Sequence, residues 1–174
     1  MCGTIEPRKN HRLLLNVWRE LVRQRGERAP KLVVVGSRGR NAGAVLDTLE
    51  QCRALQGKVI VAHGLSSPAL RRLVAHAKAL LMPSFAEGFG LPVIEALAVG
   101  TPVIASDLPA HREIAGDLAI YRDPTDGPGW LAAVSMFADG HGPAAEMRRR
   151  VAAYQPATWS QYFLRIERFL KTFV

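Results

Sequence analysis

Two glutamates, Glu87 and Glu95, stand on either side of a short loop that contains Gly88 and Gly90. The loop leads into a segment that begins near Pro92, and proline suits the first turn of a helix because its missing N–H would have no partner there. A helix N-terminus behind a glycine loop offers free backbone N–H groups and the positive end of the helix dipole. This arrangement favours a bound phosphate.

The two carboxylates indicate a ligand that is more than a phosphate. A carboxylate close to a bound phosphate would repel it, so Glu87 and Glu95 are better suited to accept hydrogen bonds from hydroxyl groups on either side of it. Hydroxyl, phosphate and hydroxyl together are the layout of a nucleotide sugar. The alternative is that Gly88 and Gly90 only form a tight turn and that both glutamates face solvent, because a short glycine motif alone is weak evidence.

Short apolar runs and amphipathic segments alternate along the chain and predict the elements that hold this loop. Strands are predicted at 2–5, 31–35, 58–62, 79–82, 101–105 and 118–121. Helices are predicted at 13–22, 44–55, 66–77, 91–99, 107–114, 126–138, 144–153 and 158–173. Asn10 is placed to cap the first helix, and Gly100 suits a left-handed C-cap after the helix at 91–99.

Strands that read as solid apolar runs and alternate with helices predict a parallel sheet covered on both faces. The fold class is therefore α/β, with a doubly wound parallel sheet. Ligands of such sheets bind beyond the carboxyl ends of the strands. Gly36, Gly64, Glu87 and Ser106 all fall at such ends, so their loops are expected to converge on one edge.

The glycine loop belongs to a longer pattern, Pro83-Ser84-x-x-Glu87-Gly88-Phe89-Gly90-Leu91-Pro92-x-x-Glu95-Ala96, continued by Gly100-Thr101-Pro102-Val103-Ile104-Ala105-Ser106. This pattern resembles the donor-site signature of retaining GT-B glycosyltransferases, the "glycosyl transferases group 1" family. The hallmark of that signature is two glutamates separated by seven residues. The resemblance implies a Rossmann-like domain, the C-terminal half of a GT-B fold.

The same resemblance implies a role for each residue of the loop. Glu87 would bind hydroxyls of the donor sugar and Glu95 the ribose hydroxyls. The backbone amides of the loop would hold the phosphates, with Gly88, Phe89, Gly90 and Leu91 as binding residues. Glu87 is thereby one of the two residues expected to be catalytic.

The other expected catalytic residue is Lys9, in a stretch from Gly3 to Asn10 that resembles the first strand and loop of the family's C-terminal domain. There a lysine contacts the donor diphosphate, and a cation at that place stabilises the charge that develops on the leaving group. Many members carry an arginine where this chain has Thr4. Arg8 could replace that arginine as a binding residue, and the alternative for Arg8 is a solvated turn.

Two further loops match the family's surroundings of the donor. Gly36 and Ser37 match its second strand and loop, and the glycine spacing after Gly36 is not that of a dinucleotide fingerprint. Leu65 lies in a stretch that contacts the nucleobase in relatives, beside His63, for which packing is favoured over chemistry. The wording from Gly3 to Asn10 is similar to members that use GDP-mannose.

The resemblance covers about residues 2–126, and the chain as a whole, 1–174, is interpreted as one nucleotide-sugar binding domain with C-terminal helices at about 142–174. The N-terminal acceptor domain of the family is absent, so the chain is expected to be the C-terminal part of a longer enzyme. The apolar face of the last helix is expected to be partly bared. Cys52, Trp18, Trp130 and Trp159 are nevertheless predicted to lie in the core.

The formal charge of +8 and a pI near 10.2 suit anionic partners, such as a nucleotide diphosphate or an anionic membrane face. No nucleic-acid module is present, so nucleic acid is excluded as a partner. Cys2 and Cys52 show no metal-ligand spacing, and reduced cysteines are typical of a cytoplasmic protein. The histidines form no metal or triad pattern. No metal and no cofactor besides the donor substrate are therefore expected.

The leading hypothesis is the donor-binding domain of a retaining, metal-independent glycosyltransferase. The whole enzyme would transfer a hexose from a nucleotide diphosphate sugar to a glycan or lipid-linked acceptor in surface polysaccharide synthesis, with a peripheral contact at the cytoplasmic membrane face. The fragment alone is expected to be inactive. One alternative is a non-catalytic binding or interaction module, which the missing arginine at Thr4 favours. A less favoured alternative is a nucleotide-sugar epimerase.

Overall fold

The computed structural model describes residues 1–156 and 158–173, in which strands and helices alternate as predicted. Ala157 and Val174, which the predicted domain includes, lie outside the described residues. The strands are β1 (Leu32–Val35), β2 (Val59–Ala62), β3 (Leu80–Met82), β4 (Val103–Ser106) and β5 (Ala119–Arg122). The helices are α1 (His11–Arg25), α2 (Gly43–Gln51), α3 (Ser67–Ala75), α4 (Leu91–Leu97), α5 (Pro109–Ala115), α6 (Gly127–Asp139), α7 (Pro143–Ala152) and α8 (Trp159–Leu170). Short 3-10 helices cover Pro7–Lys9, Gly26–Arg28, Arg53–Leu55 and Lys171–Phe173.

All the strands pair in parallel, so the α/β class is confirmed, although they form two sheets. β1 pairs with β2, with Leu32 opposite Val59. The second sheet has the order β3-β4-β5, with Leu80 opposite Val103 and Val103 opposite Ala119. Parallel order brings the carboxyl ends of β1 and β3 to the same edge of the molecule, which is where the predicted site loops begin.

The predicted first strand at 2–5 is wrong as a continuous strand. The segment runs parallel to β1 but makes only isolated bridges, Cys2 to Val35 and Ile5 to Arg38. The ladder is interrupted because the Gly3 carbonyl lies against the α carbon of Gly36, where a side chain would stand in any other residue: a Cβ built there would be 1.9 Å from the Gly3 oxygen. The extended segment still reaches the expected place beside β1.

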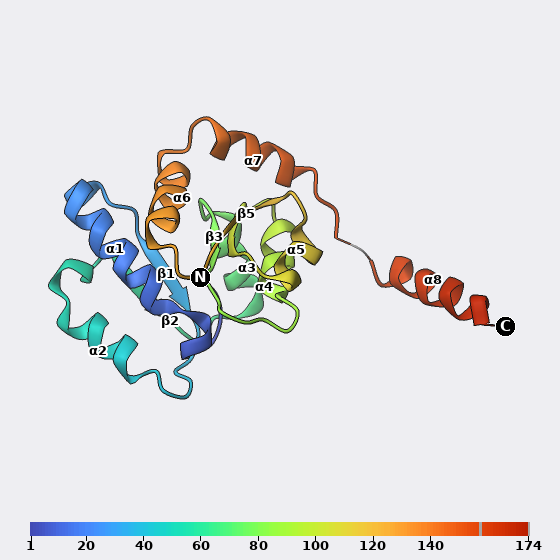
Figure 1. Ribbon diagram of the computed structural model, residues 1–174, viewed down its shortest axis with the longest axis horizontal. Coiled ribbons are helices and arrows are strands. Elements are labelled where there is room, and N and C mark those ends of the chain that lie inside the picture. Colours follow the sequence, from blue (N-terminus) through green and yellow to red (C-terminus); the bar gives the residue numbers. More distant parts are fainter. Residues whose placement is uncertain (157, 174) are drawn as a thin grey trace.

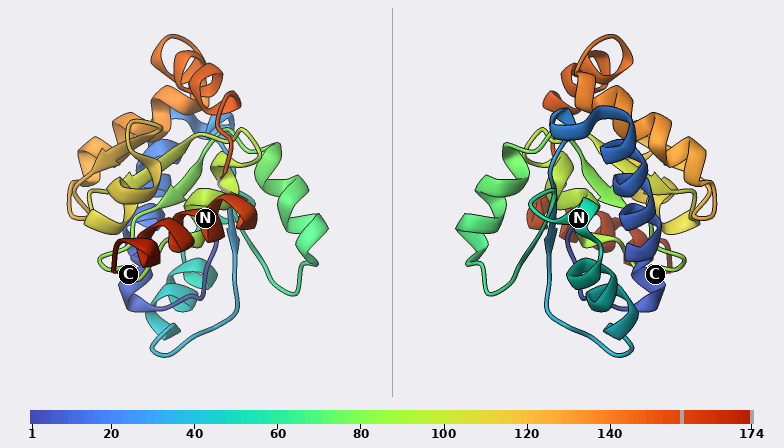
Figure 2. Two further views of the ribbon diagram at one scale, coloured as in Figure 1. Left: turned by 90° about the vertical axis from the view of Figure 1, so that its right-hand side faces the viewer. Right: turned by 90° about the vertical axis from the view of Figure 1, so that its left-hand side faces the viewer.

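Helices cover both faces of the strands. Figure 2 shows α6 on one side and α3 on the other, with the strands between them. On the α6 side, α1 packs against α6 (Figure 1) and both are apolar toward the core, which contains Leu14, Leu21 and Trp130. The α3 side is thinner, because no residue of α3 is fully buried. The core predictions for Trp18 and Trp130 are confirmed, since their exposed fractions are 3% and 0%.

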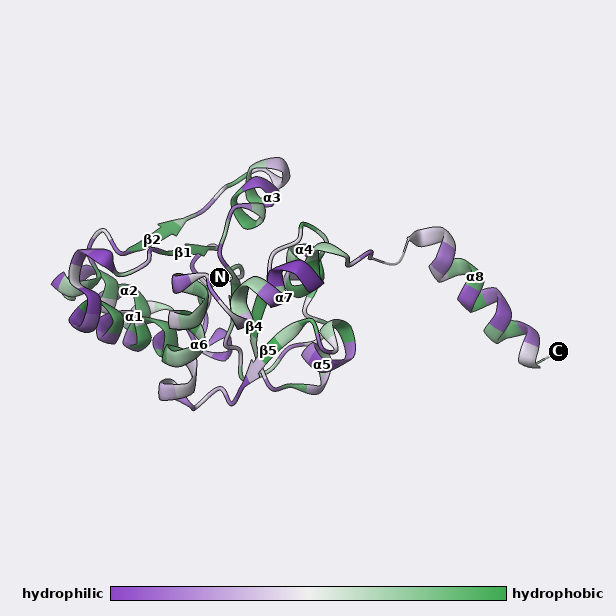
Figure 3. Ribbon diagram, turned by 90° about the horizontal axis from the view of Figure 1, so that it is seen from above, coloured by the Kyte–Doolittle hydropathy of each residue, from purple (hydrophilic) through white to green (hydrophobic). Residues whose placement is uncertain are grey.

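The C-terminal helix α8 departs from the sequence prediction. It lies apart from the body of the protein in Figure 1, and Figure 3 shows hydrophobic and hydrophilic residues alternating along it. Trp159 is 76% exposed, so its predicted place in the core is wrong, whereas the expectation of a bared apolar face agrees with exposed Phe163 and Phe169. Cys52 is only partly buried, and both cysteines are free. No described helix has the length and apolar composition needed to cross a membrane.

Candidate active site

Lys9 and Glu87, which the sequence separates by 78 residues, form a buried ion pair at the carboxyl edge of the strands. The Lys9 Nζ donates to Glu87 Oε1 at 2.6 Å, and the side chains of Lys9 and Glu87 are only 8% and 6% exposed. The Ser84 hydroxyl donates to the same oxygen, also at 2.6 Å. One carboxylate oxygen is thus held by an ammonium and a hydroxyl, while the other oxygen faces Arg8.

Arg8 joins the same cluster from its solvent side. Its guanidinium lies 3.3 Å from Glu87 Oε2 and donates to the Ala86 carbonyl oxygen at 3.2 Å. It also pairs with Glu6 at 2.7 Å and remains half exposed. Arg8 is therefore more than a solvated turn residue, because it adds a second cation beside Glu87 at the surface of the cluster.

Asn10 fixes the loop that carries these cations, and sequence reasoning assigned it another role. Its backbone is left-handed (φ 54°), and its side-chain amide donates to the carbonyl oxygens of Pro83 and Pro124 at 3.0 and 2.8 Å. The predicted helix cap is wrong, because a side chain that donates to distant carbonyls accepts no bond from the amides of α1. Since the Phe85 amide also donates to the Arg8 carbonyl, the two loops are fastened to each other.

Burial and partners act in opposite directions on Glu87. Burial alone raises the pKa of its carboxyl, but the hydrogen bonds from Lys9 and Ser84 and the charges of Lys9 and Arg8 outweigh it, so the pKa lies below its usual value. Glu87 is therefore an anion at neutral pH. Because its pKa is lower in the folded than in the unfolded state, this ionisation stabilises the fold above the unfolded-state pKa and the contribution is lost as pH falls through the folded-state pKa.

The glycine loop enters α4 with free backbone donors, as the sequence predicts. Gly90 is left-handed (φ 82°) and stands at the N-cap, where no side chain caps the helix, and Pro92 occupies its first turn. The described residues supply no hydrogen-bond partner to the amides of Phe89, Gly90 or Leu91. Gly88 is exposed, and the side chains of Phe89 and Leu91 are 57% and 59% exposed. The loop can thus be reached by a ligand from solvent.

Glu95 is exposed on α4 and lies near the N-terminal segment. Burial raises the pKa of the Cys2 thiol, the chain's amino group lowers it, and the Glu95 carboxylate raises it again, so Glu95 is within electrostatic reach of Cys2. Both predicted glutamates therefore neighbour the segment that leads to Lys9. Glu95 has no recorded hydrogen bond within the described residues and is available to a ligand.

A buried histidine under the glycine loop was assigned no chemistry from the sequence. The Nδ1 of His111 lies 2.8 Å from the Ser106 carbonyl oxygen, which can only accept, so this nitrogen carries the ring hydrogen. The Nε2 and the Ser106 hydroxyl are buried without a partner in the described residues. The ring packs against Gly90, since a Cβ built on Gly90 would be 3.3 Å from His111 Cδ2 and 3.0 Å from Ile114 Cδ1.

We expect Gly90→Ala to lower the free energy of unfolding by about 1–3 kcal/mol, because a left-handed backbone strains any other residue and the new methyl group meets Ile114. Urea unfolding measures the loss. Gly88→Ala is the matched control, because Gly88 lacks a positive φ and has nothing within 4 Å of an added Cβ. Equal losses in the two variants would contradict a special conformation at Gly90.

The structure brings some of the remaining predicted residues to the site and leaves others apart. Gly36 and Ser37 adjoin it through the N-terminal segment, because the Ile5 amide donates to the Ser37 carbonyl oxygen at 2.9 Å. Leu65 is 40% exposed, and no recorded contact joins it to Glu87 within the described residues. His63 is exposed, so its predicted packing is wrong. No three potential metal-ligating side chains cluster in residues 1–156 and 158–173.

Comparison with known proteins matches a family model described as "Glycosyl transferases group 1" to residues 1–134. The chain is 38% identical over 121 residues to the serotype-specific mannosyltransferase WbdA of Escherichia coli, a match that covers 70% of this chain and 15% of that protein. It is 36% identical over 124 residues to O-antigen chain mannosyltransferase B of Escherichia coli, covering 71% and 32%. The chain thus spans less than a third of the length of these relatives.

The fold has a counterpart among solved structures. The crystal structure of TarM superposes with a TM-score of 0.73 at 19% identity, covering 98% of this chain and 34% of that one. The predicted Rossmann-like architecture is confirmed by this likeness, which concerns the fold.

Proposed function

The chain belongs to the glycosyl transferases group 1 family, as the resemblance in its sequence implies, and from this premise we propose that it is the donor-binding domain of a retaining glycosyltransferase. The donor is a nucleotide diphosphate sugar. The observation that carries the proposal is the buried Lys9–Glu87 pair beside a glycine loop whose amides are free. Cation, carboxylate and amides are the groups that a sugar diphosphate requires.

Each group has one task in the proposed reaction. Lys9, with Arg8 beside it, neutralises the diphosphate as the glycosidic bond breaks, which is electrostatic stabilisation of a developing charge. Glu87 accepts hydrogen bonds from hydroxyls of the donor sugar, and Glu95 accepts them from the ribose. The free amides of Phe89, Gly90 and Leu91 bind phosphate oxygens. Because side-chain cations and amides meet the charge of the diphosphate, we propose transfer without a metal ion.

The proposed sugar is a hexose of mannose type, transferred to a glycan or lipid-linked acceptor in surface polysaccharide synthesis. The named activity of the relatives, O-antigen and serotype-specific mannosyltransferases, supports this substrate class. The acceptor would be bound by a further domain of a longer protein, with Met1–Val174 alone inactive. The formal charge of +8 favours a location at the anionic cytoplasmic face of a membrane.

The second candidate is a binding module of the same fold without transfer. Thr4, which is exposed and stands where many members carry an arginine, is the residue that favours it. The two candidates differ in one measurement, the release of nucleotide diphosphate from a donor by a longer protein that contains this chain. Turnover that Lys9→Ala abolishes supports the transferase, and donor binding without turnover supports the module.

Calorimetric titration with GDP, UDP and ADP tests the donor site directly. We expect one base to be preferred, GDP under the mannose proposal, and Glu95→Ala to weaken its binding roughly 10- to 100-fold, the effect of losing hydrogen bonds to a charged acceptor. Glu50→Ala on α2 is the control, because Glu50 is also an exposed helical glutamate. Equal affinity in all three chains would remove Glu95 from the site.

A further inference from the structure

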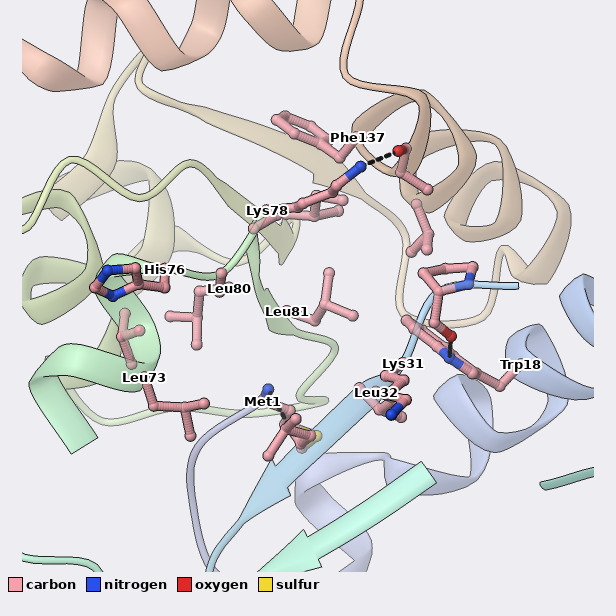
Figure 4. Close-up of a pocket in the computed structure, with 18 of the residues that line it drawn as sticks. Met1, Trp18, Lys31, Leu32, Leu73, His76, Lys78, Leu80, Leu81 and Phe137 are labelled. Atoms are coloured by element: carbon pink, nitrogen blue, oxygen red, sulfur yellow. Dashed lines mark hydrogen bonds between the residues drawn. The ribbon is translucent and has the colours of Figure 1, made fainter. Parts of the chain in front are cut away.

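The largest cavity of the described chain is at the end of the strands opposite to the candidate site. It has a volume of 760 Å³ and lies between β1 and β3, where the two sheets are separate. Figure 4 shows Leu32 of β1 and Leu80 and Leu81 of β3 around it, with Met1 beside them. Its walls are mainly apolar, so it is unsuited to the polar donor and calls for another occupant.

Helices cover the cavity on two opposite sides. Trp18 of α1 and Phe137 of α6 line one wall, and Leu73 of α3 lines another. An element placed in the cavity would therefore be covered by helices on both of its faces. That is the environment of a central strand in a parallel sheet, whose side chains are apolar on both faces.

The two strands that border the cavity turn unpaired backbone groups toward it. In β1 the amides of Leu32 and Gly36 donate to the β2 side, at Lys58 and Ala62. Since amides alternate along a strand, those of Val33 and Val35 point the other way, and Val35 bonds to the Met1 carbonyl. The Val33 amide has no partner in the described residues.

The edge of β3 is open in the same way. The Leu80 amide donates to the Pro102 carbonyl oxygen on the β4 side. By alternation the Leu81 amide faces the cavity, and Leu81 is a buried residue for whose amide the described chain provides no acceptor. Buried backbone donors are nearly always paired in folded proteins. Two facing edges with free donors are a template for one more strand.

Met1 already occupies the first position of such a strand. Its amino group donates to the Val33 carbonyl oxygen at 2.9 Å, as a strand amide would. Burial lowers the pKa of this amino group, because the charged form loses its hydration. An amide at the same position would make the same bond without a charge, and the residues before it would run along Lys31–Val33 toward the cavity.

We propose that the cavity is the seat of a further parallel β-strand, formed by about four apolar residues of a longer polypeptide that are joined to the amino group of Met1. The strand would pair with β1 and β3 and unite the two sheets in the order β2-β1-new strand-β3-β4-β5. A separate peptide fits less well, because it would leave the Met1 ammonium buried at its end. Relatives about three or more times longer than this chain allow for such a polypeptide.

The strand would also steady the candidate site from a distance. The segment from Met1 to Ile5 leads without interruption to Lys9, so fixing its start on both sides restricts the loop that holds Glu87. This inference does not depend on the donor function, because its test requires no nucleotide.

The test compares two extended chains, one with Val-Leu-Ile-Val before Met1 and one with Gly-Ser-Gly-Ser. We expect the apolar extension to raise Tm by at least about 5 °C over the Gly-Ser extension. Hydrogen exchange at the amides of Val33 and Leu81 is expected to slow at least tenfold in the apolar chain alone. Equal Tm values, with equal exchange at both amides, would overturn the proposal.

A third chain with the apolar extension and Ala79→Trp examines where the extension binds. Ala79 lines the cavity, and a tryptophan there fills the space, so the protection of Val33 and Leu81 should disappear. Protection that persists in this variant would contradict seating in the cavity. The synthetic peptide Val-Leu-Ile-Val added to the unextended chain should protect neither amide at equimolar concentration, and equal protection by it would replace the joined strand by a separate partner.

Discussion

Replacing Lys9 by alanine is expected to lower the free energy of unfolding by about 3–5 kcal/mol, the loss typical of removing one partner from a buried ion pair. The reason is the carboxylate left behind. The Glu87 side chain is 6% exposed, and without Lys9 only the Ser84 hydroxyl and the distant edge of Arg8 offset its burial. Urea or guanidinium unfolding at neutral pH measures the loss.

Two controls separate this effect from the loss of any ion pair. Arg25→Ala breaks the pair between Arg25 and Asp139, which joins residues equally distant in sequence but is more exposed, and should cost no more than about 1 kcal/mol. The double variant Lys9→Ala with Glu87→Leu should recover much of the stability, because no buried charge is left. A loss in the double variant equal to that in Lys9→Ala would mean that the ammonium packs rather than neutralises.

The dependence of the loss on pH identifies the group responsible. Burial raises the pKa of Glu87 and Lys9 is among the groups that lower it, so removing Lys9 raises it. The wild-type chain loses the stabilisation by Glu87 as pH falls, whereas the variant gains from protonating an unpaired carboxylate. The difference in stability between the two chains should therefore shrink on acidification. A difference that is constant from neutral to acid pH would assign the loss to packing.

The sequence identified Lys9 and Glu87 separately but did not indicate that they would pair. Each was recognised from its own motif, and each was assigned to a part of the donor. Their contact depends on the parallel order that brings the loops after the first segment and after β3 together, a long-range property that local patterns do not contain. Ser84 was visible in the signature, and only the fold shows its hydroxyl bonded to Glu87.

The wrong predictions also have physical causes. Asn10 has the residue type of a helix cap, but its left-handed backbone turns the side chain toward Pro83 and Pro124. Trp159 has the spacing of a core residue on an amphipathic helix, and amphipathicity predicts a covered face without saying what covers it. The strand at 2–5 was recognised from its apolar residues, whereas its interruption depends on the approach of Gly3 to Gly36.

Gly36→Ala is expected to cost at least about 3 kcal/mol, beyond the usual range for overpacking, because the clash is with backbone that no rotamer change can move. The added methyl group would be 1.9 Å from the Gly3 carbonyl oxygen and 3.3 Å from the Thr4 nitrogen. The N-terminal segment must then leave β1, and the bonds from Gly3 and Ile5 to Val35 and Ser37 are lost. Thermal and urea unfolding measure the destabilisation.

The same change should reach the candidate site, since the displaced segment carries Lys9. We expect nucleotide affinity to fall in Gly36→Ala even under conditions in which the variant is folded. Gly43→Ala is the control, because nothing lies within 4 Å of its added Cβ and alanine is the better helix former at the start of α2. If Gly36→Ala kept the stability and affinity of Gly43→Ala, the close approach of Gly3 to Gly36 would not be what holds Lys9 against Glu87.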